Sequence, residues 1–404
     1  MKRKIQSLDV DEKLKKALQK LLIDESGHEK ENLKLSVMAE VESEKEDEVS
    51  DNLESESEEE EDSEESNNHN TCEGPDGYSA GFYKAAWPVI GREVTQAIQE
   101  FFRNGRLLKQ VNATLISLIP KVSNPSVVAE FRPISCCNVL YKTITKILVQ
   151  RMRSTLDSLI SPSQNAFVPG RSIGDNILLA QELFSGYNQR HLPPRCALKV
   201  DLRKAYDTVE WDFLRAVLTL FGFPERFIMW IVECVTTPSF SVCLNGAPHG
   251  FFKGARGLRQ GDPMSPFLFV LVMETLTLLI QQLIEQNGGF YHWKCEAIRL
   301  FQLGFADDLI LFSRADTDSI QLFKEGLTVF SELSGLQANL AKSTLFCHDR
   351  RPPPGTLSLL FWTSRKGTYH LGIWVFPYWP PDSPLPIASR SSRRLMPVLP
   401  AGVE

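Results

Sequence analysis

The chain has 404 residues, a net charge of −6 and a hydrophobic fraction of 43%, which allows one large folded domain with appendages. Its eight cysteines show no C-x-x-C spacing, which argues against a zinc site or a secreted disulfide scaffold. The longest apolar stretch, residues 266–280, contains Glu274 and is shorter than the roughly 20 residues that cross a bilayer. We therefore expect a soluble intracellular protein of the nucleus or cytoplasm, with no membrane partner.

Charge is distributed unevenly along the chain. Residues 1–72 contain 10 Lys and Arg against 23 Asp and Glu, whereas the remainder contains 34 basic and 27 acidic residues. Residues 40–70 bury too little apolar surface to fold, so we expect residues 1–73 to form a disordered acidic arm. The basic remainder suits a phosphate-rich partner such as nucleic acid, and an ordinary solvated surface explains the charge count equally well.

The pattern after the arm predicts alternating helices and strands. A Gly-Pro-Asp-Gly turn opens a helical segment at residues 74–111. Strands are expected at 195–202, 301–305 and 309–312, a hairpin around 240–246, and helices at 211–221, 266–283 and 319–334. A mixed sheet with helices on one face is an α+β fold. Residues 349–404, with 10 of the 24 prolines, form a Pro-rich irregular tail.

Acidic residues lie at the ends of three expected strands. Asp201 is near the end of the first, and Asp307 and Asp308 form the turn between the other two. If these strands are neighbours, the three carboxylates converge and repel one another unless divalent cations such as Mg²⁺ neutralise them. Two such ions could support phosphoryl transfer. The Asp-Asp pair alone is more often an ordinary hairpin turn.

Seven ordered segments add to this pattern, and together they resemble the motifs of reverse transcriptases. They are residues 118–121 (LIPK), 131–135 (FRPIS), 164–171 (QNAFVPGR), 200–207 (VDLRKAYD), 256–266 (RGLRQGDPMSP), 305–308 (FADD) and 334–343 (SGLQANLAKS). Residues 74–87 also look like the segment that precedes the polymerase in plant LINE-type elements. The resemblance is to LINE-type (non-LTR retrotransposon) reverse transcriptases of plant-like character.

The resemblance implies a right-hand polymerase, with fingers and palm at residues 112–348. It implies RNA-directed DNA synthesis with two Mg²⁺ ions, or Mn²⁺, held by Asp201, Asp307, Asp308 and the backbone carbonyl of Leu202. The implied partners are an RNA template, a DNA primer and deoxynucleoside triphosphates. Because the resemblance fades after residue 348, we expect the thumb to be incomplete or absent and the enzyme truncated.

Further residues take roles from the same resemblance. Lys121 and Arg132 match the residues that grip the triphosphate, and Tyr206 matches the aromatic gate that clashes with a 2′-OH. Gln260 and Gly261 match a loop that approaches nucleotide and template, and Lys342 matches a proton donor to pyrophosphate. Each has an ordinary alternative: a surface cation for Lys121, Arg132 and Lys342, a core aromatic for Tyr206, and a turn residue for Gly261.

Two expectations concern structure rather than chemistry. Asp207 and Glu210 are expected to cap the helix that starts near Val209, and Asp262 to support its loop. Phe305 stands where many reverse transcriptases have Tyr. Two other functions stay open: a catalytically silent retroelement remnant that at most binds nucleic acid, and a palm-fold nucleotide cyclase, which gives no reason for the segments at 118–135 and 256–266.

Overall fold

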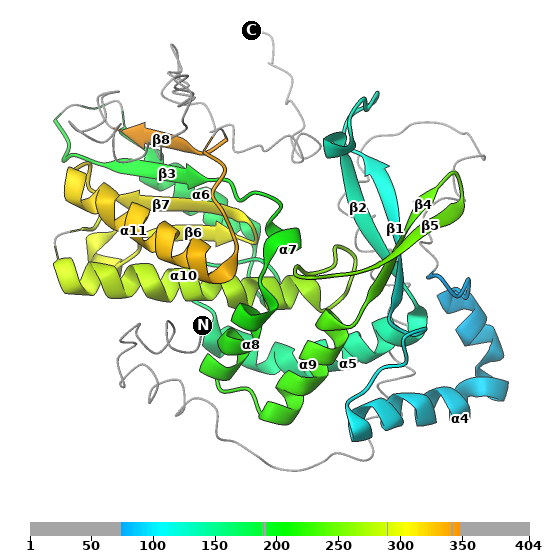
Figure 1. Cartoon of the computed structure of the whole chain (residues 1–404). Coiled ribbons are helices and arrows are strands. Elements are labelled where there is room, and N and C mark those ends of the chain that lie inside the picture. The colour runs from blue at the N-terminus through cyan, green and yellow to red at the C-terminus, as the bar shows by residue number, and fades with distance from the viewer. Residues whose placement is uncertain (1–73, 188, 190, 289, 341, 348–404) are drawn as a thin grey trace, which may run out of the picture.

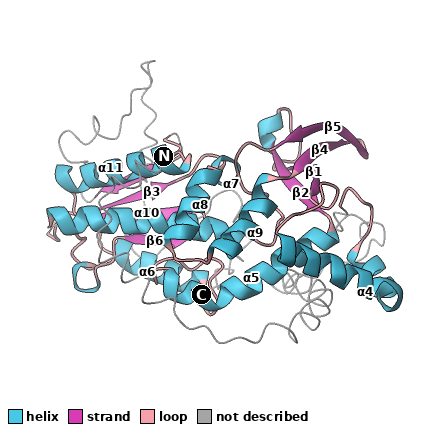
Figure 2. Cartoon of the chain, turned by 60° about the horizontal axis from the view of Figure 1, so that its bottom comes forward, coloured by secondary structure: helices cyan, strands magenta, loops and turns pink. Residues whose placement is uncertain are grey.

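The computed structural model describes residues 74–347 except 188, 190, 289 and 341. The expected acidic arm at residues 1–73 and the Pro-rich tail at residues 349–404 lie outside the described residues, and so does any thumb. The described part is built on two four-stranded sheets at opposite ends (Figure 1). Helices lie between the two sheets and pack against one of them (Figure 2).

The first sheet, which we call the palm sheet, has the strand order β6-β7-β3-β8. Its strands are β3 (Cys196–Val200), β6 (Gln302–Phe305), β7 (Asp308–Ser313) and β8 (Thr344–Cys347). Every neighbouring pair of strands in it is antiparallel. The sequence had suggested a mixed sheet, and for the palm sheet that expectation was wrong. Helices α10 (Ser265–Asn287) and α11 (Thr317–Ser334) pack together beside it.

The palm sheet is covered on both faces, so the expectation of helices on one face was wrong. Alternate strand residues point to opposite faces. Leu198, Val200 and Leu311 join the large core with α10 and α11, whereas Ala197 and Phe312 join a second cluster. Helix α6 (Ile173–Phe184), which was not among the predicted helices, contributes Ala180 and Leu183 to that second cluster.

The second sheet, which we call the fingers sheet, has the order β2-β1-β4-β5. Its strands are β1 (Ala113–Pro120), β2 (Phe131–Cys137), β4 (Ser239–Leu244) and β5 (Ala247–Lys253). Strands β1 and β4 run parallel. The expected hairpin joins β4 to β5, and both turn residues, Asn245 (φ 52°) and Gly246 (φ 78°), are left-handed, as a tight hairpin turn requires.

The remaining helices are α4 (Ala80–Asn104), α5 (Val139–Leu159), α7 (Ala205–Thr208), α8 (Trp211–Leu220) and α9 (Glu225–Thr236). Two short 3₁₀ turns, Val128–Glu130 and Glu296–Ile298, complete the described elements. Helix α4 lies within residues 74–111, the segment that the sequence predicts to be helical, and Ile98 and Phe101 are buried on its apolar side.

Helix α10 runs seven residues beyond the apolar stretch that the sequence suggested, ending at Asn287. By length and composition it is apolar enough to cross a membrane, but 67% of its most apolar window is buried inside the protein. A helix that is apolar on all sides is typical of a protein core. Burial therefore explains its composition.

Candidate active site

Three acidic residues meet at one edge of the palm sheet. Asp201 directly follows β3, whose last paired residue, Val200, lies opposite Leu309 of β7. One step further along the two strands, Asp201 lies alongside Asp308, which pairs with Phe305 across the β6–β7 turn. The antiparallel register thus brings together the three carboxylates that the sequence placed at strand ends.

The electrostatics of Asp307 reflect this convergence. The pKa of its carboxyl is raised, first because the surrounding protein partly desolvates it, and further by the negative charges of Asp308 and Asp201. A hydrogen bond to its own backbone acts in the opposite direction. Like charges held together favour binding of a cation, and carboxylate oxygens are the donors that hard divalent cations prefer.

The chemistry of the donors suits a divalent cation, because all three are carboxylates. Among the residues of 74–347 that the structure describes, however, no three Asp, Glu, His or Cys side chains lie close enough together to hold a metal ion as they stand. Leu202 directly follows Asp201, and the bridge between Leu202 and Ala338 is made by the Asp201 carbonyl and the Arg203 amide, so it does not use the Leu202 carbonyl. An open set of this kind leaves coordination positions for substrate oxygens.

Two residues of the segment at 334–343 hold Asp201. The side-chain amide of Asn339 donates to Oδ2 of Asp201 at 3.0 Å, and the backbone amide of Asn339 donates to the Asp201 carbonyl at 2.7 Å. The Asp201 amide donates to Oγ of Ser343 at 3.1 Å. Asn339 and Ser343 belong to the motif at 334–343, but their sequence does not reveal this role, because Asp201 is about 140 residues away.

The turn that carries Asp307 and Asp308 is supported by Gln164. Ala306 has a left-handed backbone (φ 53°), which is unfavourable for alanine and needs support from its surroundings. Buried Gln164 supplies it, since its Oε1 accepts the Ala306 amide at 3.2 Å. Two residues earlier on β6, the Gly304 amide donates to the Ser163 carbonyl and the Gly304 carbonyl accepts the Asn165 amide. The segment at 164–171 therefore buttresses the acidic turn.

Tyr206 lies beside the carboxylates. Its ring stacks on Phe269 of α10, with centroids 4.8 Å apart and 16° between the planes. Burial, and then the charge of Asp307, raise the pKa of its hydroxyl. The ring is half-buried, so its position is compatible both with a core aromatic and with an aromatic gate.

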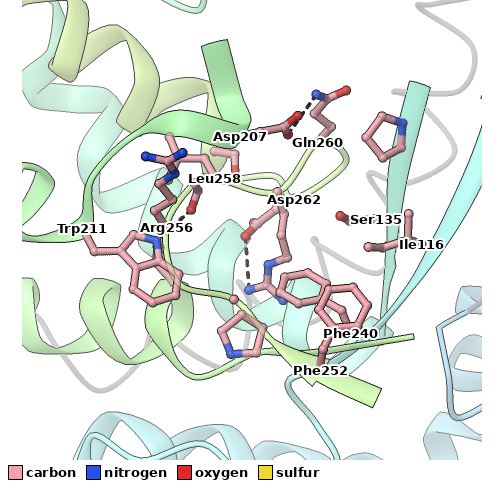
Figure 3. Close-up of a pocket in the computed structure, with 17 residues that line it drawn as sticks. Ile116, Ser135, Asp207, Trp211, Phe240, Phe252, Arg256, Leu258, Gln260 and Asp262 are labelled. Atoms are coloured by element: carbon pink, nitrogen blue, oxygen red, sulfur yellow. Dashed lines mark hydrogen bonds and ion pairs between the residues drawn. The ribbon is translucent and has the colours of Figure 1, made fainter. Parts of the chain in front are cut away.

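The loop at residues 256–262 joins the palm to the fingers (Figure 3). Gln260 donates to Oδ1 of Asp207 at 3.4 Å, and its carbonyl accepts the Ser135 amide at 2.7 Å. Gly261 has φ +104°, and a Cβ there would lie 2.9 Å from the Ser135 carbonyl, so only glycine fits without a shift. The fingers sheet is therefore fixed directly against this loop.

Arg259 and Asp262 anchor the same loop from inside. Their side chains are 6% and 1% exposed and form an ion pair at 3.5 Å. Arg259 also donates to Asn112, Thr114 and the Cys234 carbonyl, and Asp262 accepts the Tyr141 hydroxyl at 2.6 Å. The expectation that Asp262 has a structural role is consistent with this network.

The expected capping roles of Asp207 and Glu210 were wrong. Glu210 occupies the position before α8, but its side chain makes no capping hydrogen bond and instead accepts Arg256 at 3.0 Å. Asp207 lies within α7 and accepts Gln260. Each carboxylate accepts a hydrogen bond from a side chain of the loop at 256–262 and does not cap the helix end.

The three candidate cations lie at the surface. Lys121 donates to the Ala129 carbonyl at 2.9 Å. Burial raises the pKa of Asp207, and the Lys121 charge is one of the effects that partly oppose this rise. Arg132 and Lys342 are exposed, and the Lys342 amide donates to the Asn339 carbonyl at 3.0 Å. The structure does not bring these cations into contact with the three carboxylates.

Comparison with known proteins identifies the family. Residues 119–375 match the family described as reverse transcriptase (RNA-dependent DNA polymerase). The chain is 28% identical over 276 residues to the transposon TX1 uncharacterized 149 kDa protein of Xenopus laevis, covering 68% of this chain and 21% of that protein. It is 28% identical over 274 residues to the Pol polyprotein from the type-2 retrotransposable element R2DM of Drosophila melanogaster, covering 67% and 24%.

Among solved structures, apo telomerase from Candida tropicalis aligns with a TM-score of 0.44 at 16% identity, covering 67% of this chain and 56% of that one. The matched region spans only about a fifth to a quarter of the two transposon proteins. The family match covers more than half of this chain and includes all three aspartates. The chain therefore belongs to the reverse transcriptase (RNA-dependent DNA polymerase) family, of the LINE type.

Proposed function

We propose that this chain adds deoxynucleotides to a DNA primer on an RNA template, using two Mg²⁺ ions at the palm-sheet edge. The observation that carries the proposal is the convergence of Asp201, Asp307 and Asp308 at that edge, with Asp201 held by Asn339. When bound, the two ions would polarise the primer hydroxyl and neutralise charge on the reacting phosphates.

The residues of the chain have separable tasks in this reaction. Asp201, Asp307 and Asp308, with the Leu202 carbonyl, would hold the ions, and the Asn339 and Gln164 contacts keep their positions fixed. Tyr206 would lie against the sugar of the incoming nucleotide. Lys121, directly after β1, and Arg132 on β2 are exposed, and their side chains would bind the triphosphate.

Gln260, Gly261 and Lys342 complete the set. The fixed loop at 256–262 would present Gln260 and the Gly261 backbone to the nucleotide and template. Lys342 lies three residues after Asn339, on the turn that contacts Asp201, and would donate a proton to the departing pyrophosphate. Its exposed ammonium has the freedom to reach that group.

Primer extension on an RNA template tests the proposal. The full chain is compared with Asp201→Asn, which keeps the shape of the side chain but removes its charge, and with Asp318→Asn, an exposed aspartate in the first turn of α11. We expect extension by the wild type and by Asp318→Asn, and at least a hundredfold loss in Asp201→Asn. Equal extension by all three proteins would show that the carboxylate edge is not the reaction site.

A further inference from the structure

A pocket of about 280 Å³ lies between the fingers sheet and the palm (Figure 3). Its walls include Phe240 and Phe252 of the β4–β5 hairpin, Trp211 of α8, and the loop that carries Arg256 and Gln260, and strands β1 and β2 of the fingers sheet also contribute. The volume is at the lower end of the range for small-ligand pockets, so it accommodates a single small ring system.

The apolar walls suit a flat aromatic ligand. Phe240 and Phe252 lie face to face, with centroids 5.7 Å apart and 26° between the planes. The Trp211 ring is held in place because its Nε1 donates to the Gly257 carbonyl at 2.8 Å. Rigid aromatic side chains beside a cavity favour stacking of a nucleobase, whatever its identity.

The polar groups gather at one rim of the pocket. Gln260 and Asp207 meet there at 3.4 Å, and Arg256 pairs with Glu210 at 3.0 Å. Together they offer hydrogen-bond donors and acceptors on exposed side chains. An apolar body with such a rim is the environment in which proteins bind an unpaired base, stacking its faces and hydrogen-bonding its edge.

The position of the pocket distinguishes it from the site of the reacting nucleotide. Tyr206 and Asp207 are neighbours on α7, yet Tyr206 stacks on Phe269 and is affected by the Asp307 charge, whereas Asp207 lines the pocket. The incoming base must pair with the template, whereas a base stacked on the aromatic wall of this half-open pocket would meet protein side chains in place of a partner base.

We infer that this pocket binds one unpaired base of the template strand, close to the base that is being copied. The inference rests on the proposed function, because it needs a template in the adjacent site. Stacking on Phe252 would stabilise the displaced base, and the rim of Gln260 and Asp207 would face its edge. The pocket has room for only one base, so it would bind the template at a single position.

Template scanning tests the inference by equilibrium binding, without requiring catalysis. A series of primer–templates carries one abasic nucleotide at successive unpaired template positions, and the dissociation constant is measured for the full chain, Phe252→Ala and Phe251→Ala. Phe251 is the matched control, since it adjoins Phe252 on β5 and is 75% exposed, but does not line the pocket. Thermal melting monitors folding of each variant.

We expect the wild type and Phe251→Ala to lose affinity on the order of tenfold at one template position, as for loss of one base–aromatic stack. In Phe252→Ala that position-specific loss should disappear. With the wild type, 2-aminopurine at the same position should show quenched fluorescence. A uniform abasic penalty, or an equal penalty in Phe252→Ala, overturns the inference, and so does unquenched 2-aminopurine at every position.

The outcomes separate this inference from the proposed function. If the chain extends a primer in an Asp201-dependent manner but shows no position-specific abasic penalty, the pocket assignment fails and the polymerase assignment stands. If Phe252→Ala instead raises the KM for incoming nucleotides without any template-position effect, the pocket serves the incoming base, which also overturns the inference.

Discussion

The side-chain amide of Asn339 donates to Oδ2 of Asp201 at 3.0 Å, while the backbone of the same residue donates to the Asp201 carbonyl at 2.7 Å. Asp201 is therefore fixed at both its backbone and its carboxylate by one residue. Because Asn339 holds Oδ2, it also sets the direction of Oδ1 of Asp201. Supporting hydrogen bonds commonly orient metal ligands in this way.

Removal of this support should weaken metal binding. We expect Asn339→Ala to raise the Mg²⁺ concentration for half-maximal extension about tenfold, because loss of a supporting partner commonly costs 10–100-fold in metal affinity or activity. Extension rates measured over a Mg²⁺ titration check this. Template affinity should stay within about twofold of wild type, and an unchanged Mg²⁺ requirement would show that Asn339 does not position Asp201.

Gln164 should act on the same site from the other side of the turn. Gln164→Met keeps the size of the side chain but leaves the Ala306 amide without its acceptor, which costs roughly 1–3 kcal/mol of unfolding free energy. We expect about a tenfold lower extension rate, since a displacement of about 1 Å can cost on the order of a hundredfold. The exposed Gln321→Met on α11 is the control. Equal rates for both variants would exclude the buttress role.

Tyr206 should influence sugar choice. Its ring stacks on Phe269, and its hydroxyl is affected by the charge of Asp307. Tyr206→Ala should open space near the carboxylates, and we expect ribonucleotide incorporation to rise relative to deoxynucleotide incorporation. Both rates are measured together with the melting temperature. A parallel loss of both rates, with destabilisation of about 3–5 kcal/mol, would instead assign Tyr206 to the core.

The buried pair of Arg259 and Asp262 should dominate the stability of the junction between fingers and palm. Asp262→Ala leaves the guanidinium without its ion-pair partner and should cost about 3–5 kcal/mol in unfolding free energy. Glu225→Ala, which breaks the exposed pair with Arg215, should cost less than about 1 kcal/mol. Chemical denaturation measures both, and similar values for the two variants would contradict the network.

Glu274 should make stability depend on pH. Burial raises the pKa of its carboxyl to about 7, although Ser161 donates a hydrogen bond to it. The folded protein therefore holds this proton more strongly than the unfolded chain, and stability is lost as pH rises from about 4.5 to about 7. Glu274→Gln should match wild type near pH 4.5 and exceed it by roughly 2–3 kcal/mol at pH 8. An equal difference between the two proteins at both pH values would rule out this titration.

The sequence alone determined the local features of the site. The strands that carry Asp201 and the Asp307–Asp308 turn, the Asn245–Gly246 hairpin and helices α8, α10 and α11 follow from periodicity and turn residues, and lie close to the predicted ranges. These features depend on neighbours in the chain, so short stretches of sequence specify them. The motif order also indicated the family.

Tertiary structure decided which distant groups meet. The Gln164 contact to Ala306 spans 142 residues and the Asn339 contact to Asp201 spans 138, and no local pattern encodes either one. Glu210 pairs with Arg256, which is 46 residues away in the chain, and does not form the expected helix cap. Helix α6 on the second face of the palm sheet and the pocket beside Phe252 have the same origin. Strand register and helix packing fix such contacts, and both are properties of the whole folded chain.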